Sequence, residues 1–512
     1  MDSLTQDNEG QDKNPSGEIF TSPESSQYEA TLSPEQETPV PESGSQYGVN
    51  PSPSSESPPP YVEDKRKKMI IFAAVIVLVF IIILLVIRFL PKGGSQKVQD
   101  ITLNYWGLWE EKEIMQPVLD DYKKTHPNIT INYDKQDPKQ YRERLQAGIE
   151  RGEGPDIFRY HNTWVPMLVQ ILAPMPKTIY SDDEFGKVFY PVTTEDLKLS
   201  GNIYGIPLEI DGLLLFYNED MLKGVNVTVP KTWSDIQSVA TKLTVKDKDK
   251  IVTSGIALGT AENIEYFSDI LGLMLLQNGT QPVKSLFSCK DNSSTTCAVE
   301  TLTFYRKFAE TPNNVWDDTL DNSILAFAGG KVAMIFAPSW EAHVIKEFDK
   351  GNKINFKVAP VPQLPCESEP CPSVNWATYW VEGVSNKSAN QAASWEFLKY
   401  LSQADTQQKL FAEQVKYRKL FGEPYSRVDL GKSLNDNIYL APLIVSAPSM
   451  KSFYLASRVY DGDTGIDSSL IKYMKDAINS LSQGASVETV LKTADSGFQQ
   501  VYSRFGITAS GN

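Results

Sequence analysis

The chain has 512 residues, 41% of them hydrophobic, and a formal net charge of −15 at pH 7. A chain of this length can form more than one globular domain, and its acidity argues against a nucleic-acid partner. Most of the acidity belongs to residues 1–64, which hold 13 acidic residues and one lysine and leave a net charge of −3 for the other 448.

Residues 1–64 are rich in proline, serine, glutamate and glutamine, and they contain ten of the chain's 32 prolines. Their few aliphatic side chains cannot bury enough apolar surface to offset the entropy of folding, so we predict a disordered acidic tail. The stretch "PPPY" at 58–61 has the form of a polyproline ligand. We assign it no function, because so short a match is frequent by chance in a proline-rich tract.

Residues 65–91 are predicted to be a transmembrane anchor. No charged residue occurs between Met69 and Ile87, and a helix of this length crosses a hydrocarbon core of roughly 30 Å. A buried core helix is an alternative, but such helices are usually shorter and amphipathic. Four consecutive basic residues start at Lys65 and basic residues are sparser after the run, so the positive-inside rule places residues 1–64 in the cytoplasm.

A cleaved signal peptide is a second alternative for the apolar run. Signal peptides are roughly 15–30 residues long in all, whereas 64 residues precede this run and no small-residue cleavage site follows Leu90. We therefore predict an uncleaved single-pass anchor in the cell membrane, a linker over 92–100 and an extracytoplasmic domain over 101–512.

The four cysteines form two close pairs, Cys289 with Cys297 and Cys366 with Cys371. Two short-loop disulfides suit an oxidising exterior. A zinc site is an alternative, although the lone histidines of the chain supply no second ligand pair near either cysteine pair. Unpaired thiols are the remaining alternative.

Short apolar strands alternate with amphipathic helices from Ile101 onward. The stretches "ITLNYWGLW" and "ITINYD" are typical of strands, whereas "EKEIMQPVLDDYKKTHP" and "PKQYRERLQAGIERGEG" are typical of helices that end at proline or glycine. This alternation predicts an α/β fold, and the length is sufficient for two lobes.

The sequence lacks the common motifs of catalytic and metal sites. It contains no phosphate-binding loop, no His-Glu-x-x-His helix and no Gly-x-Ser-x-Gly turn. The stretch "DGDTGID" at 461–467 has its glycine one position early for a calcium loop and Lys472 where the chelating glutamate belongs, so we predict a turn. We expect no catalytic residue, no cofactor and no metal.

Aromatic, acidic and amide residues cluster in the predicted loops that follow strands. Ligands of open α/β sheets bind at the carboxyl ends of the strands. Aromatic faces pack on the C–H faces of sugar rings while carboxylates and amides accept hydroxyl protons, so this mixture suits a carbohydrate, although it is not unique to sugars. The candidates are Trp106, Trp109 and Glu110 after the first strand, His161, Asn162 and Trp164 after "PDIFRY", Trp340 and Glu341 after "AMIFAPS", and Trp376, Tyr379 and Trp380 in "VNWATYW".

Five segments occur in an order that resembles the extracellular solute-binding proteins of ABC importers, of the maltose-binding-protein type. They are "RLQAGIERGEGPDIF", "GNIYGIPLEIDGLLLFYNEDML" with "VPKTWSDI", "AFAGGKVAMIFAPSWE", "FKVAPVPQLP" and "GVSNKSANQAASWEFLKYLS". The resemblance runs from about Ile101 to Phe505. It implies a two-lobed, type II periplasmic-binding-protein-like α/β fold with a hinge, lobe 1 comprising about 101–207 and 360–430 and lobe 2 about 208–359 and 431–512.

The resemblance also implies roles for particular residues. Asp211 matches an acidic hinge residue that touches sugar, Trp340 matches a stacking tryptophan, and Tyr460 lies in a late loop that often lines the cleft. The predicted ligand-binding set is Trp106, Trp109, Glu110, His161, Asn162, Trp164, Asp211, Trp340, Trp376, Tyr379 and Tyr460.

The implied function is capture of a sugar or oligosaccharide and its delivery to the permease of an ABC transporter, without catalysis. Family members in bacteria with one membrane usually hang from a lipidated cysteine, and here the apolar helix replaces that lipid. A sensory or glycan-adhesion module with the same fold is the alternative. A glycan-cleaving enzyme would need two carboxylates about 5–10 Å apart across a sugar.

Overall fold

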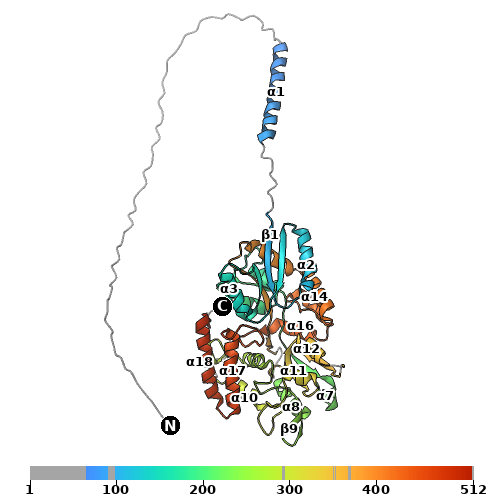
Figure 1. Cartoon of the computed structure of the whole chain (residues 1–512), viewed down its shortest axis with the longest axis vertical. Helices are drawn as coiled ribbons and strands as arrows, with labels where there is room; N and C mark the ends of the chain where they lie inside the picture. Colours follow the sequence, from blue (N-terminus) through green and yellow to red (C-terminus); the bar gives the residue numbers. More distant parts are fainter. Residues whose placement is uncertain are drawn as a thin grey trace, which may run out of the picture. The chain divides into compact units, whose positions relative to one another are not determined.

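The computed structural model describes residues 65–89, 99–290, 295–349, 351, 353–366 and 371–509. The chain divides into two units, Met1–Gly94 and Ser95–Asn512 (Figure 1). The predicted disordered tail, residues 1–64, and most of the predicted linker lie outside the described residues.

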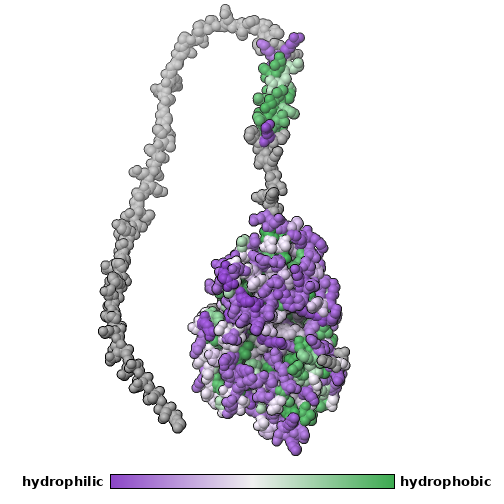
Figure 2. All heavy atoms as spheres, viewed as in Figure 1, coloured by the Kyte–Doolittle hydropathy of each residue, from purple (hydrophilic) through white to green (hydrophobic). Residues whose placement is uncertain are grey.

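The first unit contributes helix α1 (Lys65–Phe89). Its 25 residues reach about 37 Å at about 1.5 Å per residue. The stretch Arg66–Val86 is long and apolar enough to cross a membrane, by length and composition. Figure 2 shows the apolar side chains that cover α1, in contrast to the mostly hydrophilic surface of the second unit.

Lobe 1 of the second unit is built on a five-stranded sheet in the order β2-β1-β3-β15-β6. Strand β1 lies between β2 and β3 and runs parallel to both, whereas β15 is antiparallel to both β3 and β6. Alternate residues of β1, such as Leu103 and Tyr105, are buried under helices, as a half-exposed strand requires. The strands are β1 (Ile101–Gly107), β2 (Ile129–Lys135), β3 (Ile157–His161), β6 (Ile206–Pro207) and β15 (Trp380–Val384).

Amphipathic helices cover this sheet. In α2 (Lys112–Thr125), five apolar or aromatic residues from Ile114 to Tyr122 are buried on one face. The helix α5 (Asp182–Val188) begins at a capping box in which Ser181 and Glu184 satisfy each other's backbone N–H groups. The other elements of lobe 1 are α3 (Tyr141–Glu150), η1 (Asn162–Trp164), α4 (Val165–Leu168), α6 (Pro191–Leu197), β4 (Lys198–Leu199), β5 (Asn202–Ile203), α13 (Gln391–Leu401) and α14 (Ala404–Arg418).

Lobe 2 is built on a three-stranded antiparallel sheet in the order β12-β7-β13. Every residue of β7 (Leu213–Asn218) is buried, and its partners are β12 (Met334–Pro338) and β13 (Phe356–Ala359). The other elements that follow β7 in this lobe are α7 (Glu219–Gly224), α8 (Trp233–Leu243), β8 (Val245–Asp247), β9 (Lys250–Thr253), α9 (Phe267–Gln277), β10 (Thr280–Gln281), β11 (Ser285–Cys289), α10 (Cys297–Lys307), α11 (Ser323–Ala328) and α12 (Glu341–Phe348).

The C-terminal helices α17 (Ile466–Ser482) and α18 (Val487–Phe505) pack against each other and against α10 of lobe 2. Figure 1 shows α17, α18 and α10 along one side of the domain. The elements between α14 and α17 are α15 (Val428–Gly431), η2 (Lys432–Leu434), α16 (Ala441–Ser446), η3 (Ala447–Ser449) and β16 (Met450–Lys451).

Three segments, the predicted crossings between the lobes, lie side by side. The first, 208–212, joins β6 to β7; the second runs through β14 (Asn375–Trp376) to β15; and the third follows α14. Thr378 N–H donates to the Asp211 carbonyl at 2.9 Å. Gly212 allows this close approach, because a Cβ there would lie 1.8 Å from the Trp376 carbonyl oxygen.

Both predicted cysteine pairs are confirmed. Cys289 is joined to Cys297 and Cys366 to Cys371 as disulfides, and all four cysteines are therefore used. This finding excludes the zinc and free-thiol alternatives.

Candidate ligand-binding site

Four aromatic side chains of lobe 1 converge where β1 and β3 end and β15 begins. The ring of Trp380 lies 5.2 Å from Trp109, 5.2 Å from His161 and 5.6 Å from Trp164, centroid to centroid, with interplanar angles of 72°, 77° and 76°. Edge-to-face contacts of this kind are the preferred geometry of aromatic pairs. A fifth ring, Tyr460, lies 5.9 Å from Trp109. We call Trp109, His161, Trp164, Trp380 and Tyr460 the aromatic cluster.

Strand register places these rings together. His161 is the last residue of β3 and pairs with Trp380, the first residue of the antiparallel strand β15. Paired residues on adjacent strands point to the same face of a sheet. Tyr460 is 41% exposed and has a φ of +57°, a backbone conformation that is uncommon for a residue other than glycine.

Lobe 2 contributes a second group of polar and aromatic residues. Trp340 immediately precedes α12, and its ring lies 6.3 Å from that of Tyr266. The buried Glu341 accepts hydrogen bonds at Oε1 from the Tyr266 hydroxyl at 2.5 Å and from the Arg458 guanidinium at 2.9 Å. Burial raises the pKa of Glu341, and the Tyr266 and Arg458 contacts oppose that rise.

The first crossing contributes Asp211, which is 3% exposed. Its carboxylate accepts hydrogen bonds from the Gly212 N–H at 2.7 Å, the Ser339 N–H at 3.0 Å and the Ser339 hydroxyl at 2.6 Å. Burial raises the pKa of Asp211 to about 7, although these hydrogen bonds favour the charged form. Asp211 thus ties the first crossing to the end of β12, directly before Trp340.

Three buried polar atoms around these groups have no hydrogen-bond partner within the described residues. They are Nε1 of Trp109, Nε1 of Trp164 and Oε2 of Glu341. Leaving such a group unpaired costs about 1–3 kcal/mol. Two donors and one acceptor of this kind are suited to a ligand that carries hydroxyl groups.

Two further predicted residues lie beside the aromatic cluster rather than in it. The Asp196 carboxylate accepts from the Tyr379 hydroxyl at 2.7 Å and from the Asn162 side-chain amide at 2.9 Å. Burial raises the pKa of Asp196 to about 6. Asn162 and Asp196 line a hollow of about 330 Å³ between η1, α6 and the end of α18.

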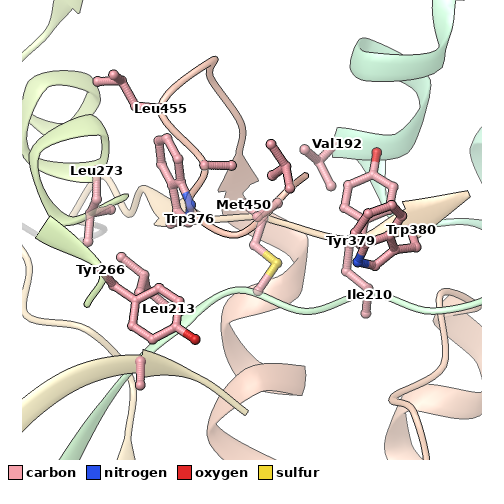
Figure 3. Close-up of a cluster of buried hydrophobic side chains, with 14 of the residues drawn as sticks. Val192, Ile210, Leu213, Tyr266, Leu273, Trp376, Tyr379, Trp380, Met450 and Leu455 are labelled. Carbon is pink, nitrogen blue, oxygen red and sulfur yellow. The ribbon is translucent and has the colours of Figure 1, made fainter. Parts of the chain in front are cut away.

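Three other predicted residues are engaged elsewhere. Trp376 is fully buried and donates from Nε1 to Asp269 at 3.0 Å. Figure 3 shows Trp376 and Trp380 on opposite sides of Met450. The Glu110 carboxylate is buried in contact with two arginines, and Trp106 lies beside Tyr141. A ligand role for each of these residues stays a prediction.

Neither Tyr266 nor Arg458 is marked by a signal in the sequence. Tyr266 precedes α9 without a motif that marks it, and its partner Glu341 is far away in the chain. Arg458 has a φ of +59°, which the sequence does not reveal. Trp380 was recognised within its motif, but its place at the centre of the aromatic cluster depends on the pairing of β15 with β3.

Residues 118–418 match the family model described as "Bacterial extracellular solute-binding protein". The maltodextrin-binding protein MdxE of Bacillus subtilis (strain 168) is 28% identical over 217 residues, covering 41% of this chain and 48% of that protein. The maltotriose-binding protein of Pyrococcus abyssi (strain GE5 / Orsay) is 23% identical over 305 residues, covering 57% of this chain and 60% of that protein. The chain thus spans about half to three fifths of these two relatives.

Among solved structures, the GacH receptor of Streptomyces glaucescens, described unliganded and in complex with acarbose, superposes with a TM-score of 0.59 at 21% identity. The superposition covers 79% of this chain and 99% of the receptor. This likeness confirms the predicted two-lobed, type II periplasmic-binding-protein-like α/β fold.

Proposed function

The chain belongs to the bacterial extracellular solute-binding protein family, and from this premise we propose that it captures a maltodextrin-like oligosaccharide between its two lobes and delivers it to an ABC permease. The family membership supports solute binding and transport. The relatives that match, a maltodextrin-binding and a maltotriose-binding protein, favour an α-glucan as the ligand.

The observation that carries the proposal is the composition of the two walls. Lobe 1 supplies four rings of the aromatic cluster, all except Tyr460, and lobe 2 supplies Trp340, Tyr266 and the carboxylate of Glu341. Aromatic faces and carboxylates are the groups that bind the two kinds of surface on a sugar, its C–H faces and its hydroxyls. The unpartnered Nε1 atoms of Trp109 and Trp164 add two donors for hydroxyl oxygens.

The proposal includes a membrane anchor. Helix α1 spans the membrane once, the acidic residues 1–64 lie in the cytoplasm, and the second unit lies outside. The length and apolar composition of α1 support the span, and the basic residues from Lys65 to Lys68 support the orientation. Tethering the receptor to the membrane raises its local concentration near the permease.

We propose binding without catalysis. The two carboxylates of the candidate site already accept hydrogen bonds from the protein: Asp211 from Ser339 and Gly212, and Glu341 from Tyr266 and Arg458. These contacts support an electrostatic and orienting role. Incubation of the chain with labelled maltodextrins, followed by product analysis, is expected to recover the sugars intact.

Calorimetric titration of the full chain in lipid nanodiscs tests the binding proposal. Maltotriose and maltotetraose are expected to bind, and Trp340→Ala and Asp211→Ala are expected to weaken that binding. Trp395→Phe is the control, because Trp395 is buried in α13 outside the site. A chain that binds no sugar, while a solute of another class stabilises it against heat, would overturn the carbohydrate assignment.

A further inference from the structure

A buried group of charged residues lies next to the aromatic cluster. Arg159 on β3, which is 2% exposed, donates from Nη1 to Glu110 at 2.7 Å and from Nε to Glu382 at 2.6 Å. Arg418 on α14 contacts the second oxygen of Glu110 at 3.0 Å and Glu423 at 3.1 Å. We call Glu110, Arg159, Glu382, Arg418 and Glu423 the ion cluster.

Arg159 pairs with three carboxylates, and the two that it contacts most closely, Glu110 and Glu382, lie next to or near a ring of the aromatic cluster in the chain. Glu110 directly follows Trp109, and its carbonyl oxygen accepts from the Tyr133 hydroxyl at 2.7 Å. Glu382 lies two residues after Trp380 on β15, so both side chains point to the same face. One guanidinium therefore links the segments that carry Trp109 and Trp380.

The pairing of β3 with β15 also relates Arg159 to the rings of the aromatic cluster. Arg159 pairs with Glu382 across β3 and β15, and His161 pairs with Trp380 two residues further along. A slip of one residue in this pairing would turn His161 and Trp380 away from each other. The Arg159–Glu382 ion pair thus belongs to the same register as the central ring contact.

Hydrogen bonds in and around the ion cluster also connect these segments to two crossings. The Trp380 N–H donates to Glu209 on the first crossing at 3.0 Å. Gln414 on α14 donates to Glu110 at 3.1 Å and accepts from the N–H of Glu423, on the third crossing, at 2.8 Å.

Net stabilisation does not explain so many buried charges. The cost of desolvating a buried ion pair often cancels its attraction, and an apolar replacement of equal volume is often at least as stable. Burial raises the pKa of Glu110 to about 8, whereas Arg159 and Arg418 outweigh burial at Glu423 and lower its pKa to about 2. What a buried hydrogen-bonded network does supply is a defined position for the groups it holds.

We infer that Arg159 is a positioning residue of the ligand site: it holds Glu110 and Glu382 together, and thereby sets the Trp109 ring against the Trp380 ring. The inference depends on the proposed function only for the identity of the ligand. Arg159 is shielded from the ligand by burial and acts through the two tryptophans.

The test compares two buried arginines in the full chain in nanodiscs. Arg159→Gln removes the link. Arg306→Gln is the matched control, because Arg306 in lobe 2 is also buried and donates to the Gly259 carbonyl at 2.7 Å, away from the rings. Trp109→Phe defines the part of the tryptophan circular dichroism that arises from the Trp109–Trp380 pair.

Without sugar, Arg159→Gln is expected to lose this part of the dichroism, and Arg306→Gln to keep it. With maltotetraose, Arg159→Gln is expected to raise the Kd at least tenfold and Arg306→Gln less than twofold, with Arg159→Lys intermediate. A folded Arg159→Gln variant with unchanged dichroism and Kd would overturn the inference, as would equal losses in Arg306→Gln.

If Arg159→Gln does not fold, the same two measurements are made on Arg159→Lys. A weaker tryptophan dichroism and a higher Kd would support the inference, and unchanged values would contradict it. If the unaltered chain binds no maltodextrin, the proposed function fails. The sugar-free dichroism then still decides the role of Arg159.

Discussion

The two walls of the candidate site are held in different ways. In lobe 1 the aromatic cluster is set by a strand pairing and backed by Arg159, which is 2% exposed. In lobe 2 the corresponding cation is Arg458, which is 43% exposed and lies in a loop with a left-handed backbone. Buried groups held by hydrogen bonds and ion pairs keep one geometry, whereas exposed loops adjust at low cost. We expect lobe 1 to define the position of the ligand and lobe 2 to adapt to it as the lobes close.

The largest effect should come from removing the central ring of lobe 1. Trp380→Ala is expected to lower the free energy of unfolding by about 3–5 kcal/mol, as for other buried tryptophans. Trp340→Ala, at a partly exposed position in lobe 2, should lower it by less than about 2 kcal/mol while weakening sugar binding. Denaturant unfolding of both variants measures the difference, and equal losses would remove the contrast between the walls.

The crossing between the walls should be the next most sensitive point. Gly212→Ala places a Cβ against the Trp376 carbonyl, and overpacking of this kind costs about 1–3 kcal/mol. Gly186→Ala in α5 is the control, because a Cβ there meets no atom within 4 Å. If thermal unfolding shows the two variants to be equally stable, the crossings do not approach as closely as described.

Acid should weaken lobe 1 through His161. Burial lowers the pKa of His161 from 6.5 to about 3, so the folded domain binds its proton less readily than the unfolded chain. The stability due to neutral His161 is present above about pH 6.5 and lost as the pH falls toward about 3. Between pH 7 and pH 5 we expect the stability that His161 contributes to fall by about 1–2 kcal/mol, measured as the difference in the pH dependence of unfolding between the unaltered chain and His161→Gln. If the free energy of unfolding of His161→Gln changes with pH as steeply as that of the unaltered chain, this assignment is wrong.

The smallest effect on stability is expected at Arg458. Because its ion pair with Glu341 is partly exposed, Arg458→Gln should change the free energy of unfolding by less than about 1 kcal/mol. Sugar affinity should nevertheless fall, since Glu341 loses a partner at the ligand wall. A large loss of stability in chemical denaturation would show that the lobe 2 wall is as tightly held as that of lobe 1.

Local patterns were sufficient to predict the elements but not the site. The apolar run of α1 and the strands that become β1 and β3 are local in sequence, and so are the two cysteine pairs. Trp376 and Trp380 show the limit: they are four residues apart in one motif, yet one donates to Asp269 and the other centres the aromatic cluster. The difference arises from strand pairing and crossing geometry, which join distant parts of the chain.

Local sequence patterns also could not predict which charged residues are buried together. Glu110 follows a strand, where ligand-binding residues are expected, but Arg159 on β3 and Arg418 and Gln414 on α14 contact its carboxylate. No spacing in the sequence indicates these contacts, because β3 and α14 are both far from Glu110 in the chain.

Hydrogen–deuterium exchange of the full chain with and without maltotetraose tests most directly whether the ligand is held between the lobes. We predict protection in both walls at once, in peptides that contain Trp109 and Trp164 from lobe 1 and Tyr266 and Trp340 from lobe 2. Protection confined to one lobe, or none at saturating sugar, would contradict the account.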